Sequence, residues 1–177
     1  MSPLWAWPHV RREDLPGIES DHRPASRTKP ELAVEPPCWA KTSPGPLKGP
    51  IRAVADGAHA GAAVLKPAGE SGMTVVGRLR EGAAPSTVPG ARPKGERGRP
   101  RIHGAGRIDP AKRAGQPRGW STGEFESYGA KVVEEYKTFL ASWRPAGGTI
   151  RVVLVDEPKG SRACLCIPTP RRASGRS

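Results

Sequence analysis

The sequence predicts an α+β fold in which a strand–helix–strand unit and a set of antiparallel strands are separated by long irregular segments. Residues 51–80 alternate short apolar runs with a helix-spaced segment, and residues 119–167 hold several runs rich in β-branched side chains. Glycine (22) and proline (21) together make up 43 of 177 residues, and only 36% of residues are hydrophobic. This composition predicts a small folded part joined to disordered Pro/Gly/Arg-rich segments.

Residues 1–50 are predicted to form an irregular, proline-rich N-terminal segment. A short helix is expected over 28–34, because Thr28 can cap it, Pro30 suits its first turn and Glu31 complements the partial positive charge there. Five prolines lie between residues 36 and 50. Since proline lacks the backbone N–H that a helix needs, we expect no helix in that stretch.

Residues 51–80 are predicted to form a strand, a helix and a second strand, the composition of one βαβ unit. The first strand covers residues 51–55 and ends at the turn Asp56-Gly57. Apolar residues recur at helical spacing over 59–70, interrupted by Pro67. The second strand is expected over 73–79.

The rest of the chain is predicted to divide into three parts. Residues 81–118 form a basic disordered linker without regular structure, 119–167 a β-rich region, and 168–177 a disordered tail. Within the β-rich region, the expected strands are 124–128, 132–143, 149–155 and 162–167. The last two flank a turn and predict an antiparallel hairpin.

Positive charge is the strongest global signal in the sequence. The net charge is +12, and between Arg78 and Arg118 eleven Lys/Arg and three acids leave 11 − 3 = +8. Such a charge favours polyanions and predicts DNA as the partner. The alternative is a solvated basic loop without a binding role. Eight residues are predicted to contact DNA: Arg92, Lys94, Arg97, Arg99, Arg101, Lys112, Arg113 and Arg118.

Within this basic stretch, Gly98-Arg99-Pro100 is similar to the core of an AT-hook, which inserts into a narrow minor groove. Contact with phosphates, independent of base sequence, is the simpler functional prediction.

Asp56 is the candidate catalytic and metal-binding residue. A carboxylate directly after a buried strand lies at the rim of a sheet, where α/β proteins bind ligands, and carboxylate oxygens suit Mg²⁺. The alternative is an ordinary Asp-Gly turn. His59 lies close enough in sequence to approach Asp56, although a solvent-facing position on the predicted helix explains it more simply.

The remaining candidate motifs predict no chemistry. Cys164 and Cys166 are two apart on a predicted strand and are expected to pack in the core, while the histidines lack metal-ligand spacing. Gly104-Ala-Gly106 follows no strand and is no dinucleotide fingerprint. The absence of a signal peptide or an 18-residue apolar run predicts a soluble, intracellular protein without a membrane partner.

An ordered series of segments resembles the central region of DDE-type transposases of bacterial insertion sequences, those with a ribonuclease-H-like core and a β-rich insertion. The similar segments, in order, are RPASRTKPELA (23–33), IRAVADGAHAGAAVLKP (51–67), TVVGRLRE (74–81), the basic run 92–101, RAGQPRGW (113–120), YKTFL (136–140), RPAGG (144–148) and IRVVLV (150–155). The resemblance implies a partial ribonuclease-H-like core at 51–80 and the insertion at 119–167.

The resemblance also implies DNA transposition, recombination and metal-dependent DNA cleavage, with Mg²⁺ or Mn²⁺ held by two Asp and one Glu. Only Asp56 matches this triad, as the second carboxylate. We therefore expect a truncated, catalytically incomplete fragment that does not hold the metal stably. It would be located in the bacterial cytoplasm, with the nucleoid if DNA-bound. A small non-enzymatic nucleic-acid-binding protein and a non-functional remnant are the alternatives, and the oligomeric state is left open.

Overall fold

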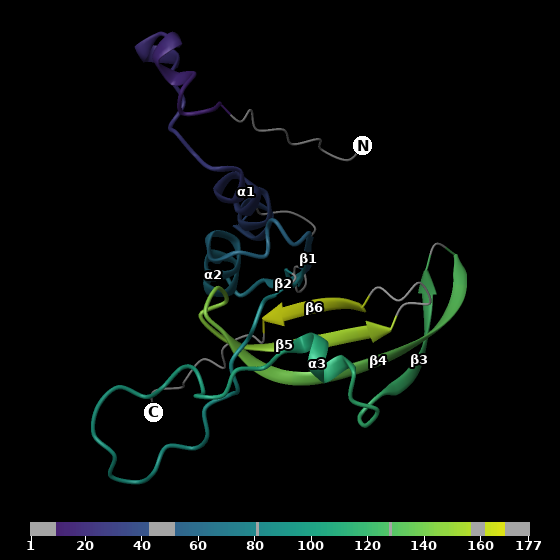
Figure 1. Cartoon of the computed structure of the whole chain (residues 1–177). Coiled ribbons are helices and arrows are strands. Elements are labelled where there is room, and N and C mark those ends of the chain that lie inside the picture. Colours follow the sequence, from purple (N-terminus) through teal and green to yellow (C-terminus); the bar gives the residue numbers. More distant parts are fainter. Residues whose placement is uncertain (1–9, 43–51, 81, 128, 157–161, 169–177) are drawn as a thin grey trace.

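The computed structural model describes residues 10–42, 52–80, 82–127, 129–156 and 162–168. Its centre is one six-stranded mixed sheet in the order β1-β2-β6-β5-β4-β3 (Figure 1). The strands are β1 (Arg52–Ala55), β2 (Thr74–Arg78), β3 (Ser121–Ser127), β4 (Ala130–Trp143), β5 (Gly148–Asp156) and β6 (Arg162–Pro168). The helices are α1 (Lys29–Thr42), α2 (Ala62–Glu70) and α3 (Pro110–Ala114), and η1 (Leu15–Gly17) and η2 (Ser20–His22) are short 3₁₀ turns. The predicted α+β class is confirmed.

The strand–helix–strand unit forms as predicted. β1 pairs with β2 in parallel, with Val54 opposite Val76, and α2 connects the two strands. Val64, Leu65 and Ala68 of α2 are buried, and Leu65 and Ala68 pack with Met73 and Val75. Of the apolar residues expected at helical spacing, Val64 and Ala68 lie on the buried face of the helix, whereas Ala63 is exposed. α2 begins at Ala62 rather than at residue 59, and it continues through Pro67.

β3, β4, β5 and β6 form an antiparallel meander, and the predicted hairpin of the last two strands is confirmed. The meander joins the strand–helix–strand unit, because β6 also pairs antiparallel with β2 between Gly77 and Cys166. Both units thus belong to one sheet. The backbone of β6 is described but its side chains are not, so the predicted packing of Cys164 and Cys166 lies outside the described side chains, and residues 169–177 lie outside the described residues.

The second half of the core lies where α3 and residue 108 cover the meander. Ile108 and Ala114 pack with Ala141, Ile150, Val152 and Leu154, all of them buried. Trp143, at the end of β4, is half-buried and packs against this cluster and against the cluster around Leu65. The core therefore extends from β1 and β2 to β4, while the described residues of β3 add no buried side chain to it.

Two predictions about proline-rich or basic segments were wrong. α1 runs from Lys29 to Thr42, through Pro36 and Pro37, where no helix was expected. Its first turn is capped as predicted, since the backbone N–H of Thr28 donates to Glu31 Oε2 at 2.7 Å and the Thr28 hydroxyl to the same oxygen at 2.9 Å. Beyond the prolines, the helix packs on α2 through Cys38, and this packing offsets the lost backbone bonds.

The segment 81–118 was predicted to have no regular structure, but it contains α3. Asp109 Oδ1 accepts hydrogen bonds from the backbone N–H groups of Ala111 (2.9 Å) and Lys112 (3.2 Å), and Pro110 occupies the first helical turn. An Asp-Pro pair is a strong helix start, and it is strong enough to begin a one-turn helix here.

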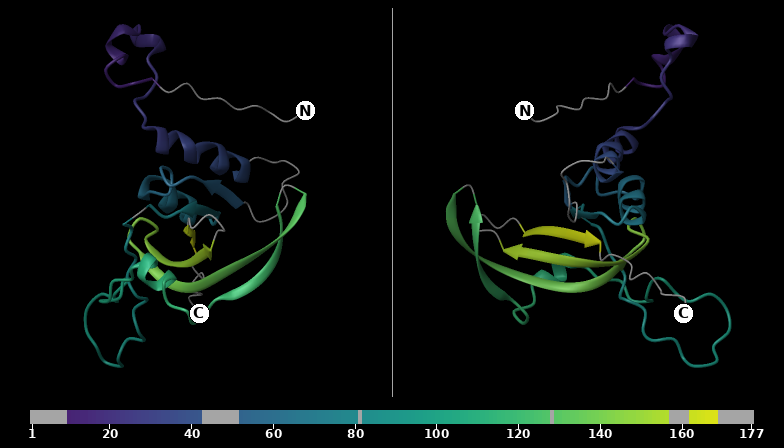
Figure 2. Two further views of the ribbon diagram at one scale, coloured as in Figure 1. Left: turned by 45° about the vertical axis from the view of Figure 1, so that its right-hand side comes forward. Right: turned by 180° about the vertical axis from the view of Figure 1, so that it is seen from behind.

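The chain between β2 and α3 forms a long loop that leaves and re-enters the sheet region at one place. In Figures 1 and 2 this teal loop extends away from the sheet in each view, on the side opposite to the β3–β4 hairpin. The segment with η1 and η2 also stands apart from the sheet.

Candidate functional site

Asp56 follows β1 directly, as predicted, and its side chain is 69% exposed. Its Oδ1 accepts hydrogen bonds from the backbone N–H groups of Ala58 and His59, both at 3.1 Å. The same oxygen lies 2.7 Å from His59 Nδ1. These contacts close the turn between β1 and α2, so Asp56 serves the local backbone in the way an Asx turn does.

His59 does not occupy the solvent-facing helical position that was expected, because α2 begins three residues later. Its ring instead contacts Asp56, and this hydrogen bond is the main cause that holds the pKa of the Asp56 carboxyl below its ordinary value. The backbone N–H of His59 adds to the effect. The His59 ring and the two backbone N–H groups thus stabilise the ionised form of the Asp56 carboxyl group.

The residues around Asp56 do not fit a two-metal centre. Such a centre needs several carboxylates to hold two divalent ions. Among the residues that the structure describes, no three His, Cys, Asp or Glu side chains gather as a metal site would require. Among the described residues, the side chain that is hydrogen-bonded to the Asp56 carboxylate is that of His59.

The basic loop, defined here as residues 88–103, carries five of the eight predicted DNA-binding residues. Its ends are tied together by a stem: Thr87 N donates to Gly106 O at 2.7 Å, Gly104 N to Thr87 O at 2.8 Å, and Ile108 N to Pro85 O at 2.7 Å. Ser86 and Arg107 also form an antiparallel β-bridge within this stem. The two ends of the basic loop are therefore joined by backbone hydrogen bonds, and the segment is a closed loop rather than an unstructured linker.

The stem is joined to the sheet through Ser142, which is fully buried at the end of β4. Ser86 and Ser142 exchange two backbone hydrogen bonds of 2.8 Å, and the Ser142 hydroxyl donates to Thr87 O at 2.9 Å. These three bonds position the basic loop relative to the rigid core.

Gly104 and Gly106, which match no dinucleotide motif, have a structural role in this stem. An added Cβ at Gly104 would stand 2.3 Å from Thr87 Oγ1, and one at Gly106 would stand 3.0 Å from Thr87 Cγ2. A side chain at either position would collide with Thr87, because the two sides of the stem lie so close together.

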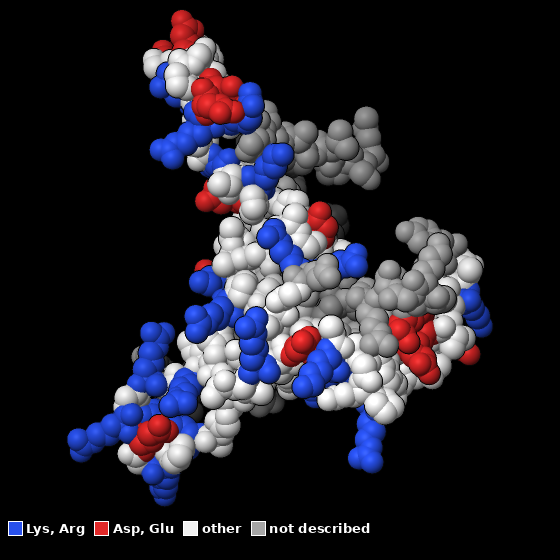
Figure 3. All heavy atoms as spheres, in the orientation of Figure 1, with Lys and Arg blue, Asp and Glu red and all other residues white. Residues whose placement is uncertain are grey.

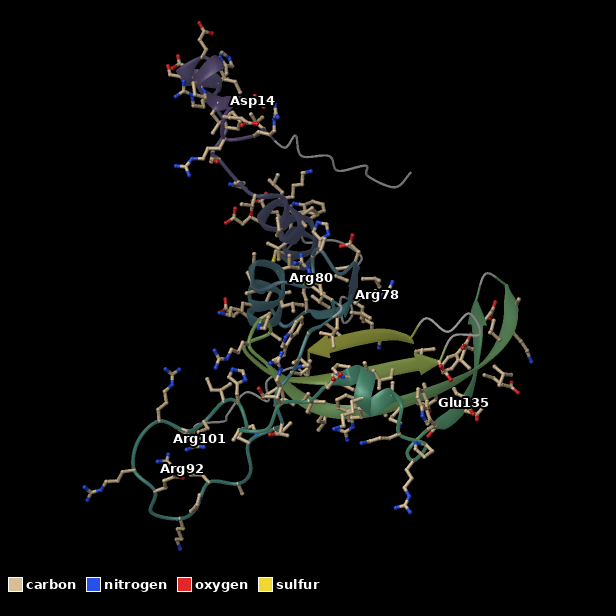
Figure 4. All side chains as sticks on the ribbon, in the orientation of Figure 1. Asp14, Arg78, Arg80, Arg92, Arg101 and Glu135 are labelled. Carbon is tan, nitrogen blue, oxygen red and sulfur yellow. The ribbon has the colours of Figure 1, made fainter. Side chains whose placement is uncertain are left out.

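Arg92 braces the basic loop from within. Its Nη2 donates to the carbonyl oxygens of Glu96 and Gly98, the latter at 2.8 Å, and it points into the ring that the loop forms (Figure 4). All five cations of the loop are exposed, and Figure 3 shows Lys and Arg side chains gathered at the lower left, where the loop lies in Figure 1; besides Arg92 they are Lys94, Arg97, Arg99 and Arg101. Of the five predicted DNA-binding residues in the loop, Arg92 thus bonds to the loop itself, and four others remain for contact with a ligand.

The last three predicted DNA-binding residues lie on and after α3. Lys112 and Arg118 are exposed, and Arg113 is half-buried with its guanidinium carbon 4.1 Å from the centroid of the Phe139 ring. α3 itself is held to β4 by Lys137, whose Nζ donates to the carbonyl oxygens of Arg113 (3.1 Å) and Gln116 (2.6 Å). Lys137 Nζ also lies 4.8 Å from the centroid of the Trp120 ring.

A cavity of about 970 Å³ opens between β2, residues 82–84 and α3, next to the stem. Its cationic lining residues are Arg78, Arg80, Arg107, Lys112 and Arg113. The first three were counted in the basic stretch but were not predicted as binding residues, because the sequence does not show that β2 and the stem meet α3. The basic loop and this basic pocket adjoin one another and form the candidate site.

Comparison of the chain with protein-family models, curated proteins and solved structures finds no match in any of the three. No helix in the described parts of the chain has the length and apolarity to cross a membrane.

Proposed function

We propose that this protein binds nucleic acid through the phosphate backbone, using the exposed cations of the basic loop as its main contact surface. The single observation that carries the proposal is the closed basic loop, which presents Lys94, Arg97, Arg99 and Arg101 on a stem anchored to the core. Phosphate contacts of this kind supply most of sequence-independent affinity and require no base-specific geometry.

The arrangement supports binding more strongly than composition alone does. In a solvated basic linker the charged side chains would have no fixed position. In this loop, the hydrogen bonds between Thr87 and Gly104 fix the place where the two ends of the loop leave the core. Within the loop, Glu96 is the one acid, and its carbonyl and carboxylate both face Arg92. The four other cations therefore keep their charge for an external anion.

The resemblance to DDE transposases supplies a second proposal, concerning origin: the protein is a catalytically incomplete relative that has kept DNA contact. The feature that favours it is the carboxylate of Asp56 directly after β1 in a parallel strand–helix–strand unit. A plasmid-nicking assay with Mg²⁺ or Mn²⁺ tests the incompleteness. We expect no nicking, and nicking that disappears in Asp56→Ala would overturn it.

Binding itself is tested by measuring the affinity of the full chain for a duplex of arbitrary sequence. The test variant replaces Arg97, Arg99 and Arg101 by Ala, and a control variant removes three exposed cations elsewhere: Arg12, Lys29 and Lys131. We expect the loop variant to lose at least about tenfold in affinity at low salt, and the control to lose much less. Equal losses in the two variants would show that the loop is no special contact surface.

A further inference from the structure

The basic pocket differs from the basic loop in shape, although the two are continuous. Arg107 forms a β-bridge with Ser86 in the stem and also lines the pocket. Ala83 and Ala84, which directly precede the stem in the sequence, line the pocket as well. A strand of nucleic acid bound along the loop would therefore reach the pocket at the loop's base.

Charge in the pocket favours an anion. Five Lys or Arg residues line it, and among the described lining residues Asp109 is the one acid. The Asp109 carboxylate already accepts two backbone hydrogen bonds at the start of α3 and serves that helix. Among the described lining residues, positive side chains therefore outnumber negative ones by five to one, which favours a phosphate group.

The pocket is more than a phosphate site, because its floor is apolar. Leu79, Ile108 and Leu154 are buried core residues that also line the pocket, and the volume of 970 Å³ is at the upper end of the range of about 300–1,000 Å³ typical for organic ligands. Apolar side chains beside cations suit a ligand with a flat heterocycle at one end and a phosphate at the other.

Arg113 is the best positioned of the pocket cations. Its guanidinium rests on the Phe139 ring at 4.1 Å, and its backbone is held by Lys137. Stacking on an aromatic ring orients the planar group before a ligand arrives, which lowers the entropy cost of binding. Phe139 itself is not among the pocket-lining residues, so it acts on a ligand only through Arg113.

From these observations we infer that the pocket binds one nucleoside phosphate unit, either an unpaired nucleotide of a bound strand or a free nucleotide. Binding of a nucleotide that belongs to a strand rests on the proposed function and extends it. A nucleobase within a duplex must leave its stack before it can enter a pocket. The pocket then gives the protein a preference for single-stranded or frayed nucleic acid over intact duplex.

The test uses AMP, adenosine and inorganic phosphate as separate probes, with the full chain and calorimetric or fluorescence detection. AMP is expected to bind more tightly than adenosine or phosphate, because only AMP satisfies both the cations and the apolar floor. Arg113→Gln is expected to weaken AMP binding about tenfold or more, the loss of a charge-assisted bond. Arg151→Gln, an equal loss of charge at an exposed position of β5 outside the pocket lining, is the control and should have little effect.

Two further variants protect the test from a folding failure. Arg107→Gln removes a second lining cation, and Phe139→Leu removes the ring under Arg113 while leaving the pocket lining intact. Both are expected to weaken AMP binding. Absence of AMP binding, or binding that is equal in the wild type, Arg113→Gln and Arg107→Gln, would overturn the inference.

A single-stranded ten-nucleotide oligonucleotide separates the two sources. If its affinity falls in Arg113→Gln by the same factor as that of AMP, the pocket holds a nucleotide of a strand; if only AMP responds, the ligand is a free nucleotide. If AMP and the oligonucleotide bind equally well to the wild type and the pocket variants, while duplex affinity still falls in the loop variant, this inference alone is contradicted. The reverse result would contradict the proposed function alone.

Discussion

Gly104 lies so close to Thr87 that a Cβ atom on residue 104 would stand 2.3 Å from the Thr87 hydroxyl oxygen and 2.5 Å from its carbonyl oxygen. The same two residues are joined by a backbone hydrogen bond of 2.8 Å, from Gly104 N to Thr87 O. This contact is one of those that close the stem of the basic loop, which carries the five loop cations.

Replacing Gly104 by Ala should therefore open the stem. Because the clash involves backbone, we expect a destabilisation of about 1–3 kcal/mol, measured by urea unfolding. Gly90→Ala is the matched control, since it lies in the same loop and an added Cβ there meets nothing within 4 Å. If the two substitutions cost the same, the stem is not the tight contact described.

Lys137 is a second position where removal of one side chain should be costly. It is 5% exposed, and its ammonium group satisfies the carbonyl oxygens of Arg113 and Gln116. Lys137→Met keeps the aliphatic stem but leaves both carbonyls without this donor, so we expect a loss of about 1–3 kcal/mol in the free energy of unfolding. Lys131→Met, on an exposed part of the same strand, should change stability by less than about 0.5 kcal/mol.

The Asp56–His59 pair predicts a pH dependence of stability. The folded-state pKa of Asp56 is below its ordinary value, which is about 3.9 in unfolded chains. The ionised carboxylate therefore stabilises the fold above about pH 4, and this contribution is lost as pH falls through the lowered folded-state pKa. Asp56→Asn should lower the thermal midpoint at pH 6, and the difference from wild type should shrink below pH 3.

Glu126→Gln, an exposed carboxylate on β3, is the control for that comparison. A difference between wild type and Asp56→Asn that stays constant from pH 6 to pH 2.5 would show that the carboxylate charge contributes nothing.

Local patterns predicted most of the strands but not how they assemble. The apolar runs around Val75 and Val152 are long enough to be read directly from the sequence, and both residues are buried. The pairing of β6 with β2 joins residues about 90 positions apart, and no local pattern encodes such a contact. The helix across Pro36 and Pro37 was missed for the same reason, since its packing on α2 comes from tertiary structure.

The candidate site was predictable in composition and not in geometry. The cations of the basic loop were identified from charge density alone. That Arg92 turns inward depends on the carbonyls of Glu96 and Gly98, and that Arg113 stacks on Phe139 depends on a strand 26 residues away. Asp56 was placed correctly after a strand, yet its role as a turn-closing residue is visible only from its bonds to Ala58 and His59.

The most direct test of phosphate binding by the basic loop is the salt dependence of duplex affinity. The slope of log K against log salt should be steep for the wild type and should flatten by about 0.9 for each phosphate contact removed, hence by about 2.7 when Arg97, Arg99 and Arg101 are all replaced by Ala. A slope that is shallow in the wild type, or that is unchanged in the triple variant, would contradict the claim that these three side chains bind the backbone.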